Sequence, residues 1–197
     1  YSDVIVMRHP NDGAARLAAE IAPVPVINAG DGTNQHPSQT LLDLYTIQKE
    51  FGKLEGHTIA FVGDLKYGRT VHSLVKALTH FGAKLYFVAP ETLQMPKYIL
   101  EDLDSLGIEY TLLNDYREIM GEIDVFYMTR IQRERFPDDE EYEKVKDVYI
   151  LNKEDVVGKA KEEMIILHPL PRVNEIAVDL DDTKHALYFK QAANGVP

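Results

Sequence analysis

Short apolar runs rich in β-branched and aromatic residues alternate with helix-like patterns along most of the chain. The apolar runs predict strands over residues 3–7, 24–27, 57–62, 84–88, 108–112, 124–128 and 164–167. Apolar positions at helical spacing predict helices over residues 12–21, 37–51, 70–81, 96–106 and 116–120. Such alternation is typical of parallel strands joined by crossover helices. We therefore predict an α/β fold with a doubly wound, mainly parallel sheet and helices on both faces.

The helix predicted after Pro37 divides the chain, and Gly52 supplies its end. A brief α/β unit precedes this helix, and a larger α/β unit and a connector follow it. The four segments are residues 1–36, 37–51, 52–188 and 189–197. The stretch 130–147 holds many charges around Pro137, so we expect a loop or a loosely packed helix there.

The charge balance argues against nucleic acid and anionic membranes as partners. The chain has 197 residues, with 32 acidic and 21 basic side chains and a formal net charge of −11. Such a field repels polyanions. An anionic substrate would have to be held locally by well-placed basic side chains, which makes each pocket arginine informative.

The sequence contains no cysteine. This excludes disulfides, thiolate nucleophiles and cysteine-bound zinc, and it fits a reducing compartment. The longest apolar runs are far shorter than the roughly 20 residues that cross a bilayer. We therefore expect a cytoplasmic location.

Candidate chemistry gathers just after the predicted strands, where doubly wound folds bind their ligands. Five segments stand out: 8–10, 36–39, 63–70, 128–132 and 168–172. Three of them put an arginine directly after an apolar strand, where a guanidinium can offer paired donors to a carboxylate or phosphate. A single arginine of this kind is often only a solvated or ion-paired surface residue. Three together indicate an anion site.

His36 begins the helix that divides the chain. By itself it would more often be a structural residue, but Pro37 fits the first helical turn and a helix N-terminus favours anions. Gln39 lies three residues further on and can point the same way. This helix start is therefore a second candidate anion site.

Two nucleotide-binding interpretations fail on the sequence. Residues 63–70 read Gly-x-x-x-x-Gly-Arg-Thr, close to the phosphate loop of nucleotide hydrolases, but arginine replaces the required lysine and no second acidic magnesium motif follows. The Gly-x-Gly-x-x-Gly fingerprint of dinucleotide binding is absent after every predicted strand.

The combination of motifs resembles the catalytic chains of the aspartate/ornithine carbamoyltransferase family. The matching segments follow one another with the family's order and spacing: Met7-Arg8-His9-Pro10, residues 30–40 from Gly30 to Thr40, residues 63–70, Met128-Thr129-Arg130-Ile131-Gln132 and His168-Pro169-Leu170-Pro171-Arg172. Ornithine-using members typically carry His-Cys-Leu-Pro at the last motif. Because this chain has no cysteine, it is more similar to the aspartate carbamoyltransferases.

The resemblance implies a role for each matching position. Carbamoyl phosphate would be bound by Arg8, His36, Gln39, Leu170 and Pro171. Arg8 and His36 would be the catalytic pair near the carbonyl oxygen, Gln39 would lie near the carbamoyl nitrogen, and Leu170 and Pro171 would offer backbone carbonyls. Aspartate would be bound by Arg69, Arg130 and Gln132.

The implied reaction joins the α-amine of L-aspartate to the carbamoyl group of carbamoyl phosphate. It gives N-carbamoyl-L-aspartate and phosphate, a step of de novo pyrimidine biosynthesis. Arg8 and His36 would stabilise the tetrahedral oxyanion. No metal, cofactor or covalent enzyme intermediate is required.

The resemblance also implies a larger protein. The family's chains have a preceding region with a Ser-x-Arg-Thr phosphate motif and a leucine-rich helix after the connector, so residues 1–36 would be the end of a carbamoyl phosphate domain and 52–188 an aspartate domain. Such chains form homotrimers, and some bind regulatory chains. We expect this chain alone to be poorly active. The charged stretch 133–146 would help to close the aspartate domain over its ligands, unless it is only a solvated loop.

A different hypothesis is a non-catalytic binding or scaffold module that keeps the fold. Such a module would not need all of the matching site residues in place. The complete set therefore favours an enzyme.

Overall fold

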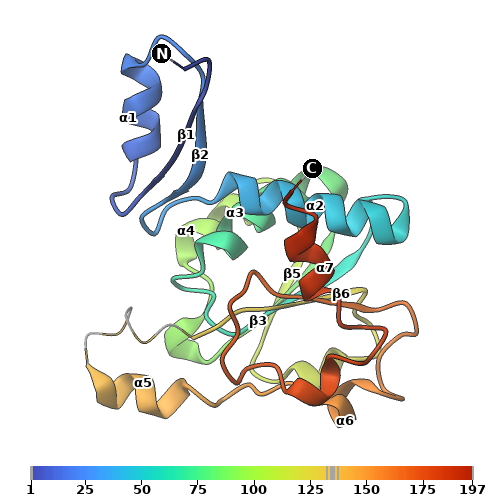
Figure 1. The fold of residues 1–197 in the computed structure, drawn as a ribbon. Helices are drawn as coiled ribbons and strands as arrows, with labels where there is room; N and C mark the ends of the chain where they lie inside the picture. Colours follow the sequence, from blue (N-terminus) through green and yellow to red (C-terminus); the bar gives the residue numbers. More distant parts are fainter. Residues whose placement is uncertain (1, 132, 134–135, 137, 197) are drawn as a thin grey trace.

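The chain folds into two α/β units joined by one helix (Figure 1). The structure is a computed structural model that describes residues 2–131, 133, 136 and 138–196. The smaller unit consists of β1 (Ile5–His9), α1 (Ala14–Ile21) and β2 (Val26–Asp31), with the two strands paired in parallel. The joining helix is α2 (Pro37–Phe51). The α/β class predicted from the sequence is confirmed.

The larger unit is built on a five-stranded parallel sheet. Its strands are β3 (Thr58–Val62), β4 (Lys84–Val88), β5 (Tyr110–Leu113), β6 (Val125–Met128) and β7 (Ile165–Leu167). Its α-helices are α3 (Arg69–Leu78), α4 (Lys97–Ser105), α5 (Asp139–Val145), α6 (Lys153–Val156) and α7 (Tyr188–Ala193). Short 3₁₀ helices lie at η1 (Thr79–Phe81), η2 (Glu91–Leu93), η3 (Tyr116–Ile119) and η5 (Val178–Leu180).

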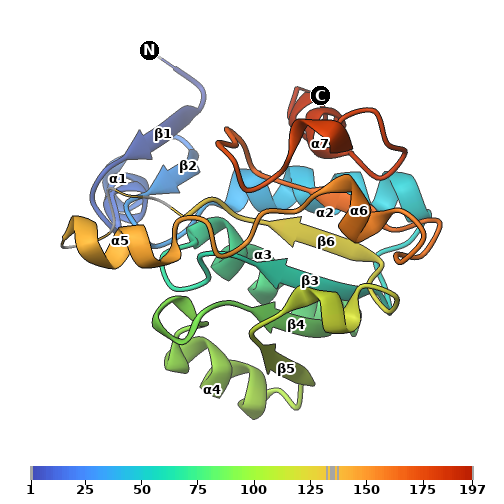
Figure 2. The ribbon, with the colours of Figure 1, turned by 90° about the horizontal axis from the view of Figure 1, so that it is seen from below.

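The strand order of this sheet is β5-β4-β3-β6-β7, and every pairing is parallel (Figure 2). The chain adds β4 and β5 on one side of β3 and then returns to add β6 and β7 on the other side. The strand order therefore reverses between β3 and β6. In open α/β sheets the ligand crevice lies beyond the carboxyl ends of the strands at such a point.

Alternate residues of the central strands feed two separate cores. Ile59 and Phe61 of β3 pack into the core beneath α2, α3 and α4, whereas Ala60 and Val62 pack into the core beneath η3, α6 and α7. All four side chains are fully buried. A sheet covered on both faces needs strands that are apolar at every position, which is why these strands appear as continuous apolar runs.

The capping residues of α2 explain where this helix begins and ends. His36 is the N-cap, and Pro37 occupies the first turn, where its missing N–H costs no helical hydrogen bond. Gly52 ends the helix in the left-handed conformation, with φ of 73°. The predicted limits of residues 37–51 are therefore confirmed.

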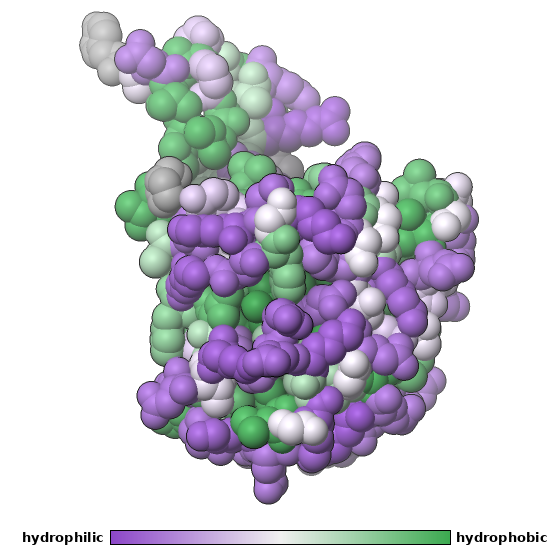
Figure 3. Space-filling model, turned by 90° about the vertical axis from the view of Figure 1, so that its right-hand side faces the viewer, coloured by the Kyte–Doolittle hydropathy of each residue, from purple (hydrophilic) through white to green (hydrophobic). Residues whose placement is uncertain are grey.

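The smaller unit differs from the prediction. Its first strand is Ile5–His9, two residues later than expected, so Arg8 lies within the strand rather than after it. Nor is this apolar run a buried strand, because β1 alternates between exposed and half-buried positions. Figure 3 shows apolar surface on this unit, whose exposed apolar side chains include Val4, Val6, Leu17, Ile21 and Ile27. One helix and one partner strand are too little to cover them.

Two further elements differ in detail from the prediction, whereas the charged stretch agrees with one of its two expected forms. Residues 116–119 form a 3₁₀ helix rather than an α-helix. The charged stretch contains a short helix, α5, whose N-cap Asp138 accepts the backbone N–H of Glu141. Helix α7 occupies the first part of the segment expected to be a connector.

Candidate active site

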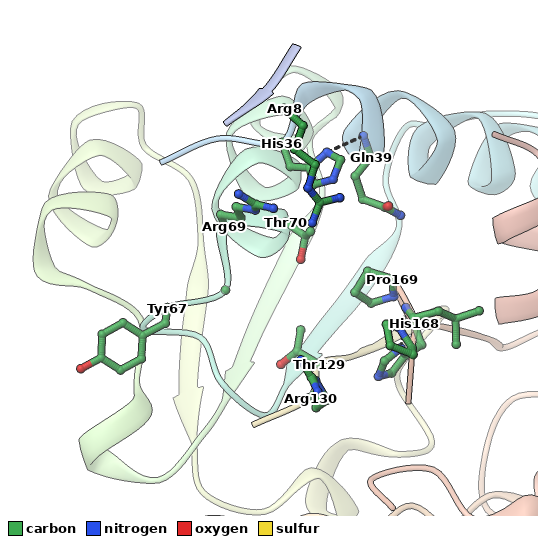
Figure 4. Close-up of a pocket in the computed structure, with 13 residues that line it drawn as sticks. Arg8, His36, Gln39, Tyr67, Arg69, Thr70, Thr129, Arg130, His168 and Pro169 are labelled. Atoms are coloured by element: carbon green, nitrogen blue, oxygen red, sulfur yellow. Dashed lines mark hydrogen bonds between the residues drawn. The ribbon is translucent and has the colours of Figure 1, made fainter. Parts of the chain in front are cut away.

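A cavity of about 390 Å³ opens where the strand order reverses. Its walls come from both units and from three strand ends of the large sheet (Figure 4). The lining residues are Arg8, His36, Gln39, Tyr67, Gly68, Arg69, Thr70, Thr129, Arg130, His168, Pro169, Leu170 and Pro171. In Figure 4, Arg8, His36 and Arg69 lie above the cavity, and Thr129, Arg130 and His168 lie below it.

The cap geometry of α2 determines the tautomer of His36. Its Nδ1 accepts the backbone N–H of Gln39 at 3.3 Å, and the Ser38 hydroxyl lies 3.3 Å from the same atom. A neutral imidazole that accepts at Nδ1 carries its proton on Nε2. Burial, with the positive charges of Arg69 and Arg8, lowers the pKa of His36 to about 4. At neutral pH the side chain is therefore an uncharged hydrogen-bond donor.

Arg69 occupies the first turn of α3 and ties the two units together. Its Nη1 donates to the backbone carbonyl of Gly32 at 2.5 Å. A Cβ atom at Gly30 would lie 3.1 Å from the Arg69 Nη2 atom, so the backbone of β2 approaches the guanidinium closely. This contact fixes the direction of the arginine at the edge of the cavity.

The cavity concentrates positive potential in an acidic protein. Arg8, Arg69 and Arg130 line it together. The N-termini of α2 and α3 both open on it, through His36 and Gly68. A helix N-terminus carries a partial positive charge and free backbone N–H groups, so both ends favour an anion. The arrangement suits a small ligand with several negative charges.

The floor of the cavity depends on a close backbone contact between β3 and β6. Gly63 follows β3 with φ of 116°, and an added Cβ atom would lie 2.4 Å from the carbonyl oxygen of Thr129. The Thr129 hydroxyl donates back to Val62 O at 3.1 Å. Only glycine at this position lets the two strand ends converge.

The segment after β7 is held by a buried histidine. His168 Nδ1 accepts the backbone N–H of Leu170 at 2.8 Å, and its Nε2 lies 2.8 Å from Glu175 Oε1. Burial would raise the pKa of Glu175, but the hydrogen bond and charge of His168 and hydrogen bonds from the backbone together lower it. Leu170 has φ of 56° and is followed by a cis peptide bond to Pro171. A left-handed conformation at leucine costs about 1–3 kcal/mol and needs such support.

The structure brings together most of the residues that the sequence indicated. Arg8, His36, Gln39, Arg69, Arg130, Leu170 and Pro171 all line the one cavity. Gln132 lies outside the described residues. The sequence interpretation gave no role to two buried side chains that support the wall of the cavity, Asp43 and Gln191. Asp43 lies one helical turn after Gln39, on a helix whose other buried residues are Thr40, Thr46 and Ile47.

The described residues lack both a membrane-spanning helix and a cluster of metal-binding side chains. They include no helix long and apolar enough to cross a membrane. They also include no group of three or more His, Asp or Glu side chains arranged to hold a metal ion.

Two family profiles match the chain in sequence order. Residues 1–50 match the aspartate/ornithine carbamoyltransferase carbamoyl-P binding domain, and residues 55–197 match the Asp/Orn binding domain of the same family.

The chain is similar to curated proteins named aspartate carbamoyltransferase catalytic subunit. It is 59% identical to that of Brachyspira hyodysenteriae, with all of this chain and 55% of the relative aligned. It is 60% identical to that of Thermococcus kodakarensis, with all of this chain and 63% of the relative aligned. The chain thus spans 55–63% of the length of these relatives.

The chain is also similar to solved structures of aspartate transcarbamoylases. The catalytic subunit of M. jannaschii aspartate transcarbamoylase superposes with a TM-score of 0.91 at 57% identity, covering all of this chain and 64% of that one. The Trypanosoma cruzi aspartate transcarbamoylase in complex with carbamoyl phosphate and aspartate gives a TM-score of 0.91 at 41% identity, covering 99% of this chain and 64% of that one.

Proposed function

The chain belongs to the aspartate/ornithine carbamoyltransferase family, and we propose that it carries out carbamoyl transfer from carbamoyl phosphate to the α-amine of L-aspartate. The products are N-carbamoyl-L-aspartate and phosphate, which places the reaction in pyrimidine biosynthesis. The observation that carries the proposal is one cavity at the sheet's reversal point in which three arginines and a neutral His36 converge. The names of the relatives support aspartate as the acceptor.

We assign the carbamoyl phosphate side to Arg8, His36 and Gln39, with the backbone of Leu170 and Pro171. In the reaction, the amine nitrogen bonds to the carbamoyl carbon and a tetrahedral oxyanion forms. The bond from that carbon to the phosphate oxygen then breaks, and the proton that the amine gives up passes to the departing phosphate. The Nε2–H of His36 and the Arg8 guanidinium are the donors that would stabilise the oxyanion. The neutral form of His36 suits this role, because it donates without adding a charge that must be neutralised later.

The aspartate side is assigned to Arg69, Arg130 and Gln132. A dicarboxylate needs two cationic anchors, and Arg69 and Arg130 come from different strand ends on either side of the cavity. Paired guanidinium–carboxylate hydrogen bonds would orient the amine toward the carbamoyl carbon. Holding both reactants in place supplies part of the rate enhancement.

The same family membership is the basis for our proposals on domains, cellular location and assembly. We propose that residues 1–36 belong to a carbamoyl phosphate domain and 52–188 to an aspartate domain, with 133–146 closing over bound ligands. We also propose that the protein works in the cytoplasm as a homotrimer of catalytic chains. The relatives are named catalytic subunits, which supports association with further chains of a regulatory type.

The test is a carbamoyl-transfer assay on the intact protein, with L-aspartate and L-ornithine offered separately as acceptors. We expect carbamoyl-aspartate to form and carbamoyl-ornithine (citrulline) not to form. Preference for ornithine would reassign the substrate. Absence of transfer to either acceptor would favour a binding module that keeps the fold.

A further inference from the structure

Asp43 is a carboxylate with no exposure to solvent, one helical turn after Gln39 on α2. Burying a carboxylate costs several kcal/mol unless hydrogen bonds compensate for the lost water. Asp43 accepts three: from Gln39 Nε2 at 2.9 Å, from Gln191 Nε2 at 2.6 Å and from the Tyr127 hydroxyl at 2.9 Å. Its partners belong to α2, α7 and β6, so the carboxylate joins three elements.

Both amides donate to the same oxygen, Asp43 Oδ1, which can accept whether the carboxyl group is ionised or carries its proton on the other oxygen. Both glutamines must turn their NH₂ groups toward Asp43. The carbonyl oxygen of each amide is then directed elsewhere. A single buried group thus determines the orientation of two side chains that could otherwise flip.

The amide of Gln39 is one of the two. Gln39 lines the cavity, and in Figure 4 its amide lies between His36 and the His168–Pro169 segment. With Nε2 held by Asp43, Gln39 offers its carbonyl oxygen as an acceptor in the cavity. An acceptor there matches an NH₂ group on a ligand, whereas a flipped amide would place NH₂ against NH₂.

The amide of Gln191 is the other. Its Oε1 accepts the backbone N–H of His168 at 2.8 Å, and both Gln191 and His168 are buried. His168 is the first residue of the segment that forms the opposite wall of the cavity, through Pro169, Leu170 and Pro171. Asp43 is therefore connected to both walls of the cavity. Gln39 itself lines one wall, and Gln191 links Asp43 to the backbone of His168 at the start of the other wall.

We propose that Asp43 is a positioning residue for carbamoyl phosphate: it fixes the acceptor orientation of Gln39 and anchors the His168–Pro171 wall through Gln191. The proposal rests on the proposed function, because the ligand group that Gln39 would accept is the carbamoyl NH₂. Asp43 itself touches no ligand and acts only through its amide partners.

Two substitutions separate an acceptor role from a merely structural one. Asp43→Leu removes the acceptor, so Gln39 loses its fixed orientation. Asp43→Asn keeps one carbonyl oxygen, and this can replace Oδ1, which accepts from both glutamines. We expect Asp43→Leu to raise the KM for carbamoyl phosphate by roughly tenfold or more, the effect of one hydrogen bond. The change in kcat and in the KM for aspartate should be smaller, and Asp43→Asn should stay within about threefold of the parent protein.

Asp155 provides the matched control. It is also a buried carboxylate with several donors, among them the Tyr116 hydroxyl and the backbone N–H of Asn152, but it does not line the cavity. Asp155→Leu should lower stability and leave the KM for carbamoyl phosphate unchanged. In a Gln39→Ala background, Asp43→Leu should raise the KM for carbamoyl phosphate by a smaller factor than it does in the parent protein, because the two residues act as a unit.

A measurement that does not depend on catalysis tests the same positioning role. The side-chain NH₂ protons of Gln39 and Gln191 should exchange slowly with solvent in the parent protein, as measured by NMR, and this protection should persist in Asp43→Asn. If Asp43→Leu does not fold, Gln191→Met tests the second connection and should also raise the KM for carbamoyl phosphate. Fast exchange in the parent, a normal KM in Asp43→Leu or Gln191→Met, or equal damage in Asp43→Asn and Asp43→Leu would overturn the positioning role. Absence of any transferase activity would instead remove the proposed function.

Discussion

The imidazole of His36 and the backbone N–H of Gln39 form a 3.3 Å hydrogen bond that both caps α2 and leaves the histidine proton on Nε2. The same contact thus stabilises a helix start and prepares a donor for the cavity. Because the N-cap must accept at Nδ1, protonating His36 would break the cap. The local fold therefore favours the neutral state of His36.

His36→Ala should lower kcat by on the order of a hundredfold, the typical cost of losing one oxyanion donor. The KM for aspartate should change little, because the anchors that we propose for that substrate are Arg69 and Arg130. Steady-state kinetics with both substrates varied gives the two constants. Near-normal turnover in the variant would contradict the donor role.

The titration of His36 is a second prediction. Burial and the charges of Arg69 and Arg8 lower the pKa of His36 to about 4. Its ring signals in a pH titration by NMR should therefore stay unchanged between pH 8 and pH 5. Free imidazole added to the same sample serves as the reference. A His36 midpoint near pH 6.5 would contradict the neutral donor.

The expectation that ligands bind beyond the carboxyl ends of the strands correctly predicted where these residues gather, for physical reasons. Parallel strands bring their carboxyl ends to one edge, so Arg69, Arg130 and the His168 segment had to converge once the strand order reversed between β3 and β6. The apolar runs of a sheet covered on both faces were also easy to detect. The half-covered strand β1 was misplaced by two residues, because its short apolar run does not mark its own end.

The support behind the site could not be predicted from local pattern. Asp43 and Gln191 are 148 residues apart and meet only through tertiary packing. A charged residue on a helix is usually solvated, so nothing in the sequence marks Asp43 as buried. Helix α7 has six residues and the charged helix α5 has seven, too few for a clear periodic signal.

Gly63→Ala should destabilise the protein by on the order of 3 kcal/mol, since the new Cβ atom would meet the Thr129 carbonyl oxygen at 2.4 Å with φ of 116°. The obstacle is backbone and cannot rotate away. Gly121→Ala is the control, because its Cβ atom would meet its nearest neighbour, Lys159 O, at an ordinary 3.5 Å. Urea unfolding of both variants measures the difference, and equal stabilities would refute the close-contact argument.

Arg130→Gln should raise the KM for aspartate by about 10- to 100-fold, the range expected for a lost hydrogen bond to a charged group. The KM for carbamoyl phosphate should change much less. Arg16→Gln removes the same charge from an exposed position on α1, where Arg16 pairs with Glu20, and should leave both constants unchanged. A uniform effect of the two substitutions would indicate that net charge, rather than a specific anchor, attracts aspartate.

The pH dependence of stability should reveal Asp43. Burial raises the pKa of Asp43 to about 7, although hydrogen bonds from Gln191, Gln39 and Tyr127 oppose the shift. Its unfolded value is about 3.8. Between these values the folded state keeps a proton that the unfolded state has lost, so the contribution of Asp43 to the free energy of unfolding falls as pH rises. The fall is on the order of 4 kcal/mol between pH 4 and pH 7 and levels off above pH 7.

Comparison with Asp43→Asn isolates this effect, because the amide has no proton to lose and the other titrating groups are shared. The stability of the variant relative to the parent should therefore increase from pH 4 to pH 7 in urea unfolding. Asp155→Asn is the control of opposite sign: burial would raise the pKa of Asp155, but hydrogen bonds, the first from the backbone of Asn152, lower it overall. Its contribution to stability is lost only as pH falls below about 4, so its difference from the parent should stay constant across the same window. A constant difference for Asp43→Asn as well would show that Asp43 is already ionised at pH 4 and that its three donors outweigh its burial.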